Sequence, residues 1–140
     1  MERDELETFA APVVNFCLLT RETVILPPDG VRRPSIKLTR FLSARNRADA
    51  PRLPSARLSE GAELRQKLKA ARAEPCGHVV NETLPPERGD RWGLPGDCIE
   101  ELWFEDVDAA LRAAQSLRTL SGHRIDTITV LTNEVVLYEG

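Results

Sequence analysis

Residues 98–114, CIEELWFEDVDAALRAA, join a strand-like run directly to a helix-like run. Alternation within Ile99–Phe104 is typical of a strand, and the alanine-rich run that follows predicts a helix to about Leu120. Asp106 is the expected N-cap, and the acids around it favour the positive end of the helix dipole. We expect Leu102 and Phe104 to pack on the helix, while Ile99, Glu101 and Trp103 share the opposite face. The buried stripe of the helix is expected to consist of Val107, Ala110, Leu111, Ala114 and Leu117.

The same order of elements also occurs earlier in the chain. The run IKLTRFLS alternates and predicts a strand, with Arg40 on the face of Ile36, Leu38 and Leu42. Residues 45–57 hold two prolines without periodicity and are expected to form a loop. Ser59 is the expected cap of a helix that starts at Glu60, ends at Pro75 and buries Leu64, Leu68 and Ala71. A strand at 77–84, a Pro/Gly-rich loop at 85–97 and a last strand at 125–138 complete the pattern.

This order, β-α-β, long loop, β-α-β, predicts an α+β fold of the ferredoxin-like split βαβ type. Such a fold has an antiparallel sheet with both helices on one face. The other face needs a cover for its apolar residues, and a second subunit is the usual cover. We therefore expect a domain at 36–140, preceded by an N-terminal extension at 1–35. The extension carries two further β-rich runs, Val13–Leu19 and Thr23–Leu26, separated by polar residues.

The composition is that of a globular chain. Of 140 residues, 41% are hydrophobic and 29% charged, which is typical of a folded domain and not of a disordered one. No apolar run reaches the length of a membrane span, and the acidic N-terminus does not resemble a secretory signal. The three cysteines, Cys17, Cys76 and Cys98, are odd in number and widely spaced, so a cytoplasmic location is expected.

The net charge of -3 conceals a strong asymmetry. Residues 32–72 contain twelve Lys and Arg against three acids, a balance of +9, so the remainder carries about -12. A basic segment can bind nucleic acid or another anion. The alternative is a basic surface that meets an acidic one across a subunit interface. Nucleic acid is the less favoured partner, because prolines interrupt the segment and few aromatic residues accompany it.

Four stretches resemble the EthD family of dimeric α/β-barrel proteins: IKLTRFL, GHVVNETLPP, GDCIEELWFEDVDAALRAA and the final VVLYEG. The resemblance covers residues 36–140, and ELWF followed by an acidic helix start is its most specific part. It implies a homodimer whose two sheets face each other around a cavity for small aromatic or polyketide-like molecules. Relatives of this kind include cofactor-free monooxygenases, lactone isomerases and haem-dependent enzymes.

Two features depart from the family pattern. The family commonly carries an aromatic residue and a histidine, as W-x-x-x-H, in its first helix. Here that helix reads EGAELRQKLKAARAE and has neither, so no role of that histidine transfers to this chain. Residues 1–35 also have no counterpart in the usual pattern.

Five residues are candidates for a site. His78 is the acid–base candidate, although a strand histidine can simply be satisfied by backbone or solvent. Arg40 and Glu101 are charges on otherwise apolar faces, so they could bind a polar ligand or form an ion pair at a dimer interface. Asn81 matches a family asparagine, and Trp103 could form the wall of a pocket or an anchor between subunits.

The pair Cys76-x-His78 is too small a set of ligands to predict a metal site, and no motif predicts a cofactor.

The first functional hypothesis is a cofactor-free oxygenase, isomerase or cyclase acting on an aromatic, quinone or lactone-like compound. The second is a dimeric binding or accessory module without chemistry, which the missing helix histidine favours. The third is an anion or nucleic-acid binder that uses residues 32–72.

Overall fold

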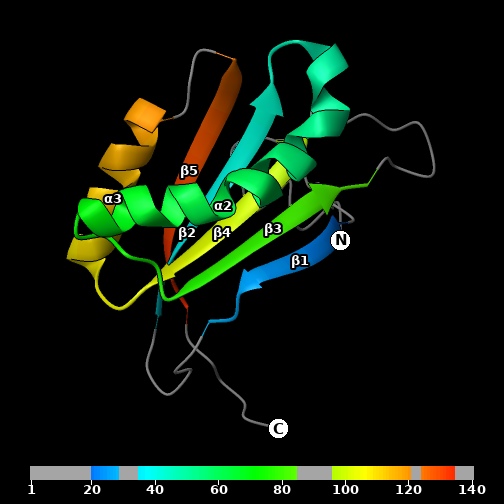
Figure 1. Ribbon diagram of the computed structural model, residues 1–140. Coiled ribbons are helices and arrows are strands. Elements are labelled where there is room, and N and C mark those ends of the chain that lie inside the picture. Colours follow the sequence, from blue (N-terminus) through cyan, green and yellow to red (C-terminus); the bar gives the residue numbers. More distant parts are fainter. Residues whose placement is uncertain (1–19, 29–34, 85–95, 121–123, 135–140) are drawn as a thin grey trace, which may run out of the picture.

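The computed structural model describes residues 20–28, 35–84, 96–120 and 124–134 (Figure 1). Five strands, two α-helices and one 3₁₀ helix occur in these residues. In chain order they are β1 (Thr20–Leu26), β2 (Ser35–Ala44), η1 (Arg47–Arg52), α2 (Leu53–Ala70), β3 (Gly77–Thr83), β4 (Cys98–Phe104), α3 (Val107–Leu120) and β5 (Ile125–Glu134).

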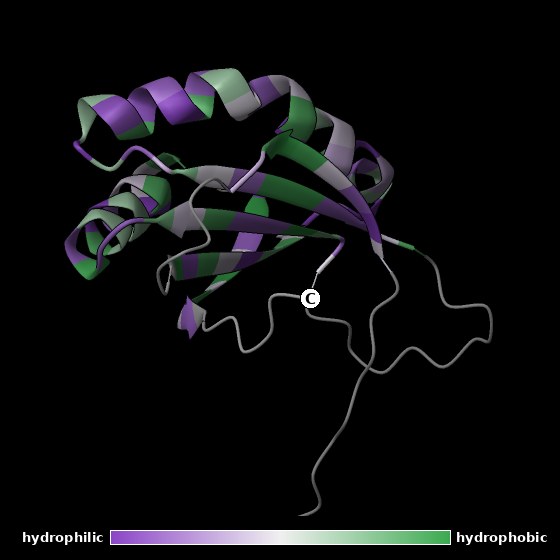
Figure 2. Cartoon of the chain, turned by 90° about the horizontal axis from the view of Figure 1, so that it is seen from below, coloured by the Kyte–Doolittle hydropathy of each residue, from purple (hydrophilic) through white to green (hydrophobic). Residues whose placement is uncertain are grey.

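The strands form one antiparallel sheet in the order β1-β3-β4-β2-β5. The units β2-α2-β3 and β4-α3-β5 interleave, so that β2 and β4 are neighbours at its centre. Figure 2 shows both helices on the same side of the sheet, which we call the helix-side face, and the opposite side we call the open face. The ferredoxin-like α+β fold predicted from the order of elements is therefore confirmed.

The main core lies between the helix-side face and the two helices. Leu38, Leu102 and Phe104 project from the two central strands and are almost fully buried. They pack against Leu64 and Leu68 of α2 and against Ala110, Ala113 and Leu117 of α3. The expected packing of Leu102 and Phe104 on the helix is thus confirmed, because the period-two alternation of β4 holds along its whole length.

The join between β4 and α3 is the one expected, but the helix is turned about its axis. The backbone N–H of Ala109 donates to Asp106 Oδ1 at 2.7 Å, so Asp106 is the N-cap. The predicted stripe was wrong at Val107 and Leu111, which are exposed. Ala113 is buried instead, because a stripe of small alanines lets the helix approach the sheet closely.

The start of α2 also differs from the prediction. Residues 47–52 form η1 and α2 begins at Leu53, where a loop was expected. Pro54 lies in the first turn of α2, where a missing N–H removes no helical hydrogen bond, so this proline does not prevent a helix. Ser59 lies inside the helix and donates to the carbonyl of Ala56 rather than capping.

The strand β1 lies beside β3 and adds a fifth strand to the four of the repeated unit. The polar residues 20–22 continue this strand and do not interrupt it. The run Val13–Leu19 lies outside the described residues, as does the predicted end of the last strand at 135–138. The sheet is therefore wider than the pattern of 36–140 alone predicts.

Replacing Phe104 with Ala should lower the free energy of unfolding by about 3–5 kcal/mol, because it leaves a cavity between the central strands and α3. The matched control is Leu111→Ala on the exposed side of α3, which should change it by about 0.5 kcal/mol or less. Urea unfolding curves measure both. Equal losses would contradict the exposed position of Leu111 on α3.

Candidate functional site

Two polar clusters lie on opposite faces of the sheet. The inner cluster is centred on Glu100 of β4, and the open-face cluster is centred on the next residue, Glu101. Because side chains alternate along a strand, Glu100 projects to the helix-side face and Glu101 to the open face.

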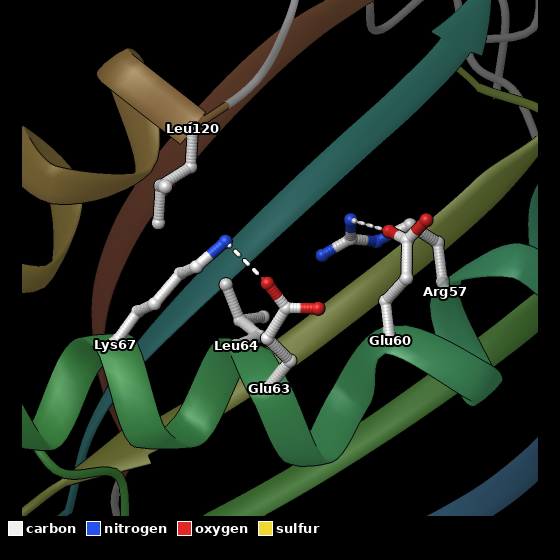
Figure 3. Close-up of a pocket in the computed structure, with 6 residues that line it drawn as sticks. All are labelled: Arg57, Glu60, Glu63, Leu64, Lys67 and Leu120. Atoms are coloured by element: carbon white, nitrogen blue, oxygen red, sulfur yellow. Dashed lines mark hydrogen bonds and ion pairs between the residues drawn. The ribbon is translucent and has the colours of Figure 1, made fainter.

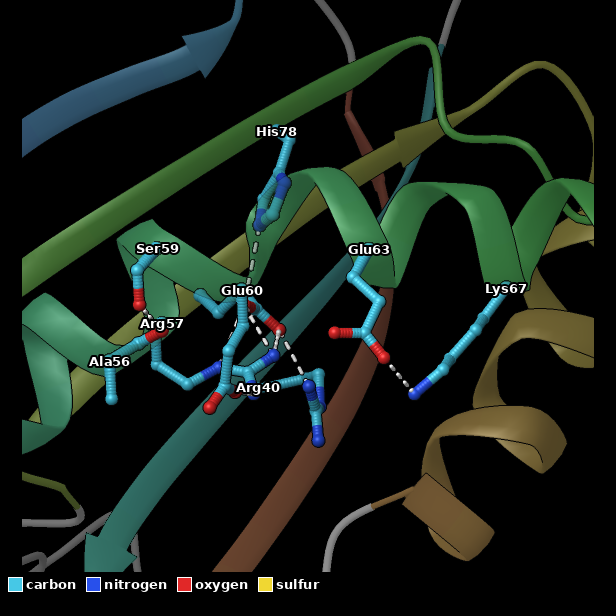
Figure 4. A network of polar contacts seen from close by, with 9 residues as sticks. Arg40, Ala56, Arg57, Ser59, Glu60, Glu63, Lys67 and His78 are labelled. Atoms are coloured by element: carbon cyan, nitrogen blue, oxygen red, sulfur yellow. Dashed lines mark hydrogen bonds and ion pairs between the residues drawn. The ribbon is translucent and has the colours of Figure 1, made fainter.

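The inner cluster surrounds the fully buried carboxylate of Glu100. Figure 4 labels the three side chains that converge on it, Arg40, Arg57 and His78. Arg40 Nη1 of β2 donates to Oε1. Arg57 of α2 donates to Oε2 from both Nε and Nη2, at 3.2 and 3.0 Å. His78 Nε2 of β3 lies 3.3 Å from Oε2 and must carry the hydrogen, since a carboxylate only accepts. Three strands and a helix therefore meet at one carboxylate.

The contacts of Glu100 outweigh its burial. Burial alone would raise the pKa of this carboxyl, but the hydrogen bond from His78 and the charges of Arg57 and Arg40 lower it to about 2. Burial lowers the pKa of Arg40, although the charge of Glu100 opposes this effect. Glu100 is thus an ionised carboxylate in the protein interior, satisfied on both oxygens.

Cys98, on the same face of β4, is a buried neutral thiol. Burial, and next the charge of Glu100, raise the pKa of Cys98 to about 12. Because the thiolate is the nucleophilic form, this cysteine is unreactive in the folded protein.

His78 is fully buried beneath α2, where Gly61 passes above its ring. A Cβ placed on Gly61 would lie 3.6 Å from His78 Cε1. The Nδ1 atom is buried without a hydrogen-bond partner among the described residues. General acid–base catalysis needs a substrate within hydrogen-bond reach, and the ring of His78 is closed off from solvent.

The open-face cluster surrounds Glu101. Lys37 Nζ of β2 lies 2.9 Å from Oε1, and Asn81 Nδ2 of β3 donates to Oε2 at 3.0 Å. The Lys37 ammonium also lies 5.4 Å from the centroid of the Trp103 ring, within cation–π range. The side chains of Lys37 and Glu101 remain 22% and 19% exposed, whereas Asn81 and Trp103 are buried beside them. Solvent, or a ligand, can therefore reach these charges.

Two pockets lie on the helical side of the molecule. One, of about 250 Å³, lies between α2 and the end of α3 (Figure 3). Two ion pairs, Arg57–Glu60 and Glu63–Lys67, occupy its wall. The other, of about 480 Å³, lies beside the start of α3 and includes Cys76 and Arg112. None of the five candidate residues lines either pocket.

The five candidates are therefore divided between the two clusters. Arg40 and His78 belong to the inner cluster, while Asn81, Glu101 and Trp103 belong to the open-face cluster. Arg40 and Glu101 lie on opposite faces and do not pair, because Arg40 shares the face of the buried Leu38 and Leu42.

Sequence reasoning missed Glu100, Arg57 and Lys37. The alternation of β4 carried a signal for Glu100, since it shares the face of Leu102 and Phe104. The same alternation placed Lys37 opposite the apolar face of β2. Arg57 carried no such signal, because its segment has no hydrophobic period and was predicted as loop.

Within the described ranges, no three His, Cys, Asp or Glu side chains converge as metal ligands. In the same ranges, no helix combines the length and hydropathy needed to cross a membrane.

A search with protein-family models finds no family that matches this chain. No curated protein matches it either. The resemblance to the EthD family therefore stays a prediction.

Replacing Glu100 with Gln should lower the free energy of unfolding by about 3–5 kcal/mol, because the buried guanidinium of Arg40 and the partly buried one of Arg57 lose their shared counter-charge. The adjacent Glu101→Gln variant is the control and should lose about 1 kcal/mol or less, since its ion pair is partly solvated. Chemical denaturation measures both values. A larger loss for Glu101→Gln would contradict the assignment of the two faces.

The stability of the wild-type protein should fall in acid. The pKa of Glu100 drops from an ordinary 4.5 to about 2 on folding, so the unfolded chain binds a proton at higher pH than the folded one. The stabilising contribution of Glu100 is complete above pH 4.5 and is lost as the pH falls toward 2. Asp97 contributes in the same direction. Its partial burial would raise the pKa of this carboxyl, but the hydrogen bonds from Arg47 and from the Ala44 N–H lower the pKa. Denaturant midpoints measured across this window test the prediction, and a level profile would contradict it.

Proposed function

We propose that this protein binds a small aromatic or otherwise apolar organic molecule on the open face of its sheet. The observation that carries the proposal is the open-face cluster, in which Lys37, Asn81 and Glu101 lie together beside Trp103. A few convergent polar groups beside an aromatic wall are typical of small-molecule sites, since the wall binds the ligand body and the polar groups orient it.

We further propose that a second copy covers this face, so that two open faces enclose the ligand. Exposed apolar side chains support this arrangement: Val24 of β1 and both Ile128 and Val130 of β5 lie on the open face. Isolated exposed residues need no explanation, but several on one face of a sheet without helices favour an interface. The EthD resemblance implies the same dimer.

Catalysis is a second candidate, and Glu101 favours it. This carboxylate is a proton acceptor on the solvent-accessible side, held between an ammonium group and an amide. An isomerisation, cyclisation or oxygenation that starts with proton removal would use Glu101 as its base. In this form of the proposal the acid–base role moves from the enclosed His78 to Glu101, and His78 positions Glu100 instead.

Nucleic-acid binding through residues 32–72 is disfavoured by the local charge pairing. Most described cations of this segment have an acidic partner within ion-pair distance, namely Lys37, Arg40, Arg45, Arg47, Arg57, Lys67 and Lys69. Paired cations offer less net charge to phosphates than the sequence balance implies.

The binding proposal is tested with anilinonaphthalene sulfonate, a fluorescent aromatic anion. The Lys37→Met variant should bind this probe about tenfold more weakly than wild type, because the sulfonate loses a charge-assisted contact while the aromatic wall remains. The control is Lys69→Met, which removes an exposed lysine of α2 on the other side of the sheet and should leave the affinity unchanged.

Equal affinities for the two variants would overturn the assignment of the ligand to the open face. Native mass spectrometry of the same samples tests the shared barrel, which requires twice the chain mass of 15.6 kDa. A monomer that still binds the probe through Lys37 would overturn the barrel and leave the ligand site standing. If the protein turns over a substrate and Glu101 is the general base, the Glu101→Gln variant should have a catalytic rate lower by about a hundredfold or more.

A further inference from the structure

The last strand, β5, presents an edge without the features that normally prevent strands from associating. It lies at the end of the sheet, and among the described residues no strand pairs with its outer side. Its central run, Thr127–Thr132, reads TITVLT and contains no charge, proline or glycine. Unpaired backbone groups along such a β-rich run are a template for another strand.

The opposite edge strand, β1, carries features that prevent pairing with another strand, unlike β5. In β1 the charged residues Arg21 and Glu22 lie within the strand. The register between β1 and β3 also shifts between Val24 and Leu26, as at a β-bulge. Charges and bulges are the usual means of blocking edge-to-edge pairing, so the chain protects one edge and leaves the other one open.

We propose that the outer edge of β5 pairs antiparallel with β5 of a second copy, around a two-fold axis at Thr129, to make one continuous ten-stranded sheet. A two-fold axis perpendicular to a sheet keeps every side chain on its own face, so opposed residues must have the same parity. Thr129 then lies opposite Thr129 of the partner subunit, and Ile128 opposite Val130 of the partner subunit.

On the open face, this register is the one that best uses the exposed apolar residues of β5. Ile128 and Val130 share the open face and are 58% and 41% exposed. An axis at Thr129 makes two Ile–Val pairs, and β-branched cross-strand pairs stabilise sheets. On the open face, an axis at Ile128 or at Val130 would make one apolar pair each. The axis at Ile128 would pair Leu131 with Ile125 on the helix-side face, but it would also set Asp126 opposite Val130 on the open face.

The other face of the strand accepts the same register. With the axis at Thr129, the exposed Leu131 lies opposite Thr127 of the partner subunit, and Asp126 lies opposite Thr132 of the partner subunit. No charge within 126–132 therefore meets a charge across the axis. The pairing leaves neither β5 edge free in the dimer, which limits the assembly to two chains at this interface.

This edge pairing is independent of the proposed function. It uses the outer backbone of β5, whereas the ligand site uses side chains on the open face of the central strands. An open-face barrel and an edge dimer could occur in one assembly, but a dimer mass alone does not distinguish them. The experiment must therefore report on the register of β5.

Disulfide trapping in the full-length chain provides that report. In the Thr129→Cys variant the two new thiols lie directly opposite, at a Cα separation of about 4.5–5.5 Å that suits a disulfide. In the control, Thr132→Cys, the cysteine of one copy and the cysteine of the other lie six residue positions apart along the paired strands. This is about 20 Å, a distance that no disulfide spans. Diamide is the oxidant and takes up the two electrons and two protons that the thiols release.

We expect Thr129→Cys to form covalent dimers at least about tenfold faster than Thr132→Cys and than the wild type, whose own cysteines set the background. Equal rates for the two variants, or no covalent dimer from Thr129→Cys, would overturn the edge pairing. Neither outcome depends on Lys37 or on probe binding. An open-face barrel alone would give no trapped dimer at Thr129, because this residue lies on the helix-side face, opposite Arg40.

Discussion

The buried carboxylate of Glu100 is the interaction on which the arrangement of the other elements depends. Removing a charge from water is costly, and only several close donors can offset that cost. Glu100 obtains them from β2, β3 and α2 at once, through Arg40, His78 and Arg57. Any movement of α2 away from the sheet would leave this carboxylate with fewer donors. The cluster therefore fixes the position of the helix more strictly than the nearby leucines can, since apolar contacts have little directionality.

Glu100 and Glu101 show how one strand serves two environments. The first is enclosed under a helix and has no access to solvent, while the second lies with Lys37 on a face that no helix covers. Two adjacent residues of β4 therefore carry one fully enclosed charge and one charge that solvent can reach. Substitutions of Lys37 on the open face need not disturb the ion cluster that holds α2 in place, because none of the donors to Glu100 lies on that face.

The parts of the structure that depend on local pattern were predictable from the sequence. The strand–helix join at Asp106 and the split βαβ order follow from alternation, capping and spacing. The grouping of site residues was not predictable, because it depends on which strand face the helices cover. Arg57 was missed for a related reason: tertiary packing extends α2 back to Leu53, through a proline-containing segment that has no hydrophobic period of its own.

The sheet order also determines when the molecule can be completed during synthesis. β2 is one of the two central strands, yet both of its neighbours lie far ahead in the chain. Arg40 of β2 and Glu100 of β4 are 60 residues apart, and Arg45, just after β2, is 81 residues from Asp126 of β5. A ribosome that adds residues from the N-terminus exposes β2 well before either partner strand exists. Contacts this distant slow the search for the native state. β2 can therefore pair with β4 only after residues 98–104 have been added and with β5 only after residues 125–134, and until then its alternating apolar residues have no partner strand.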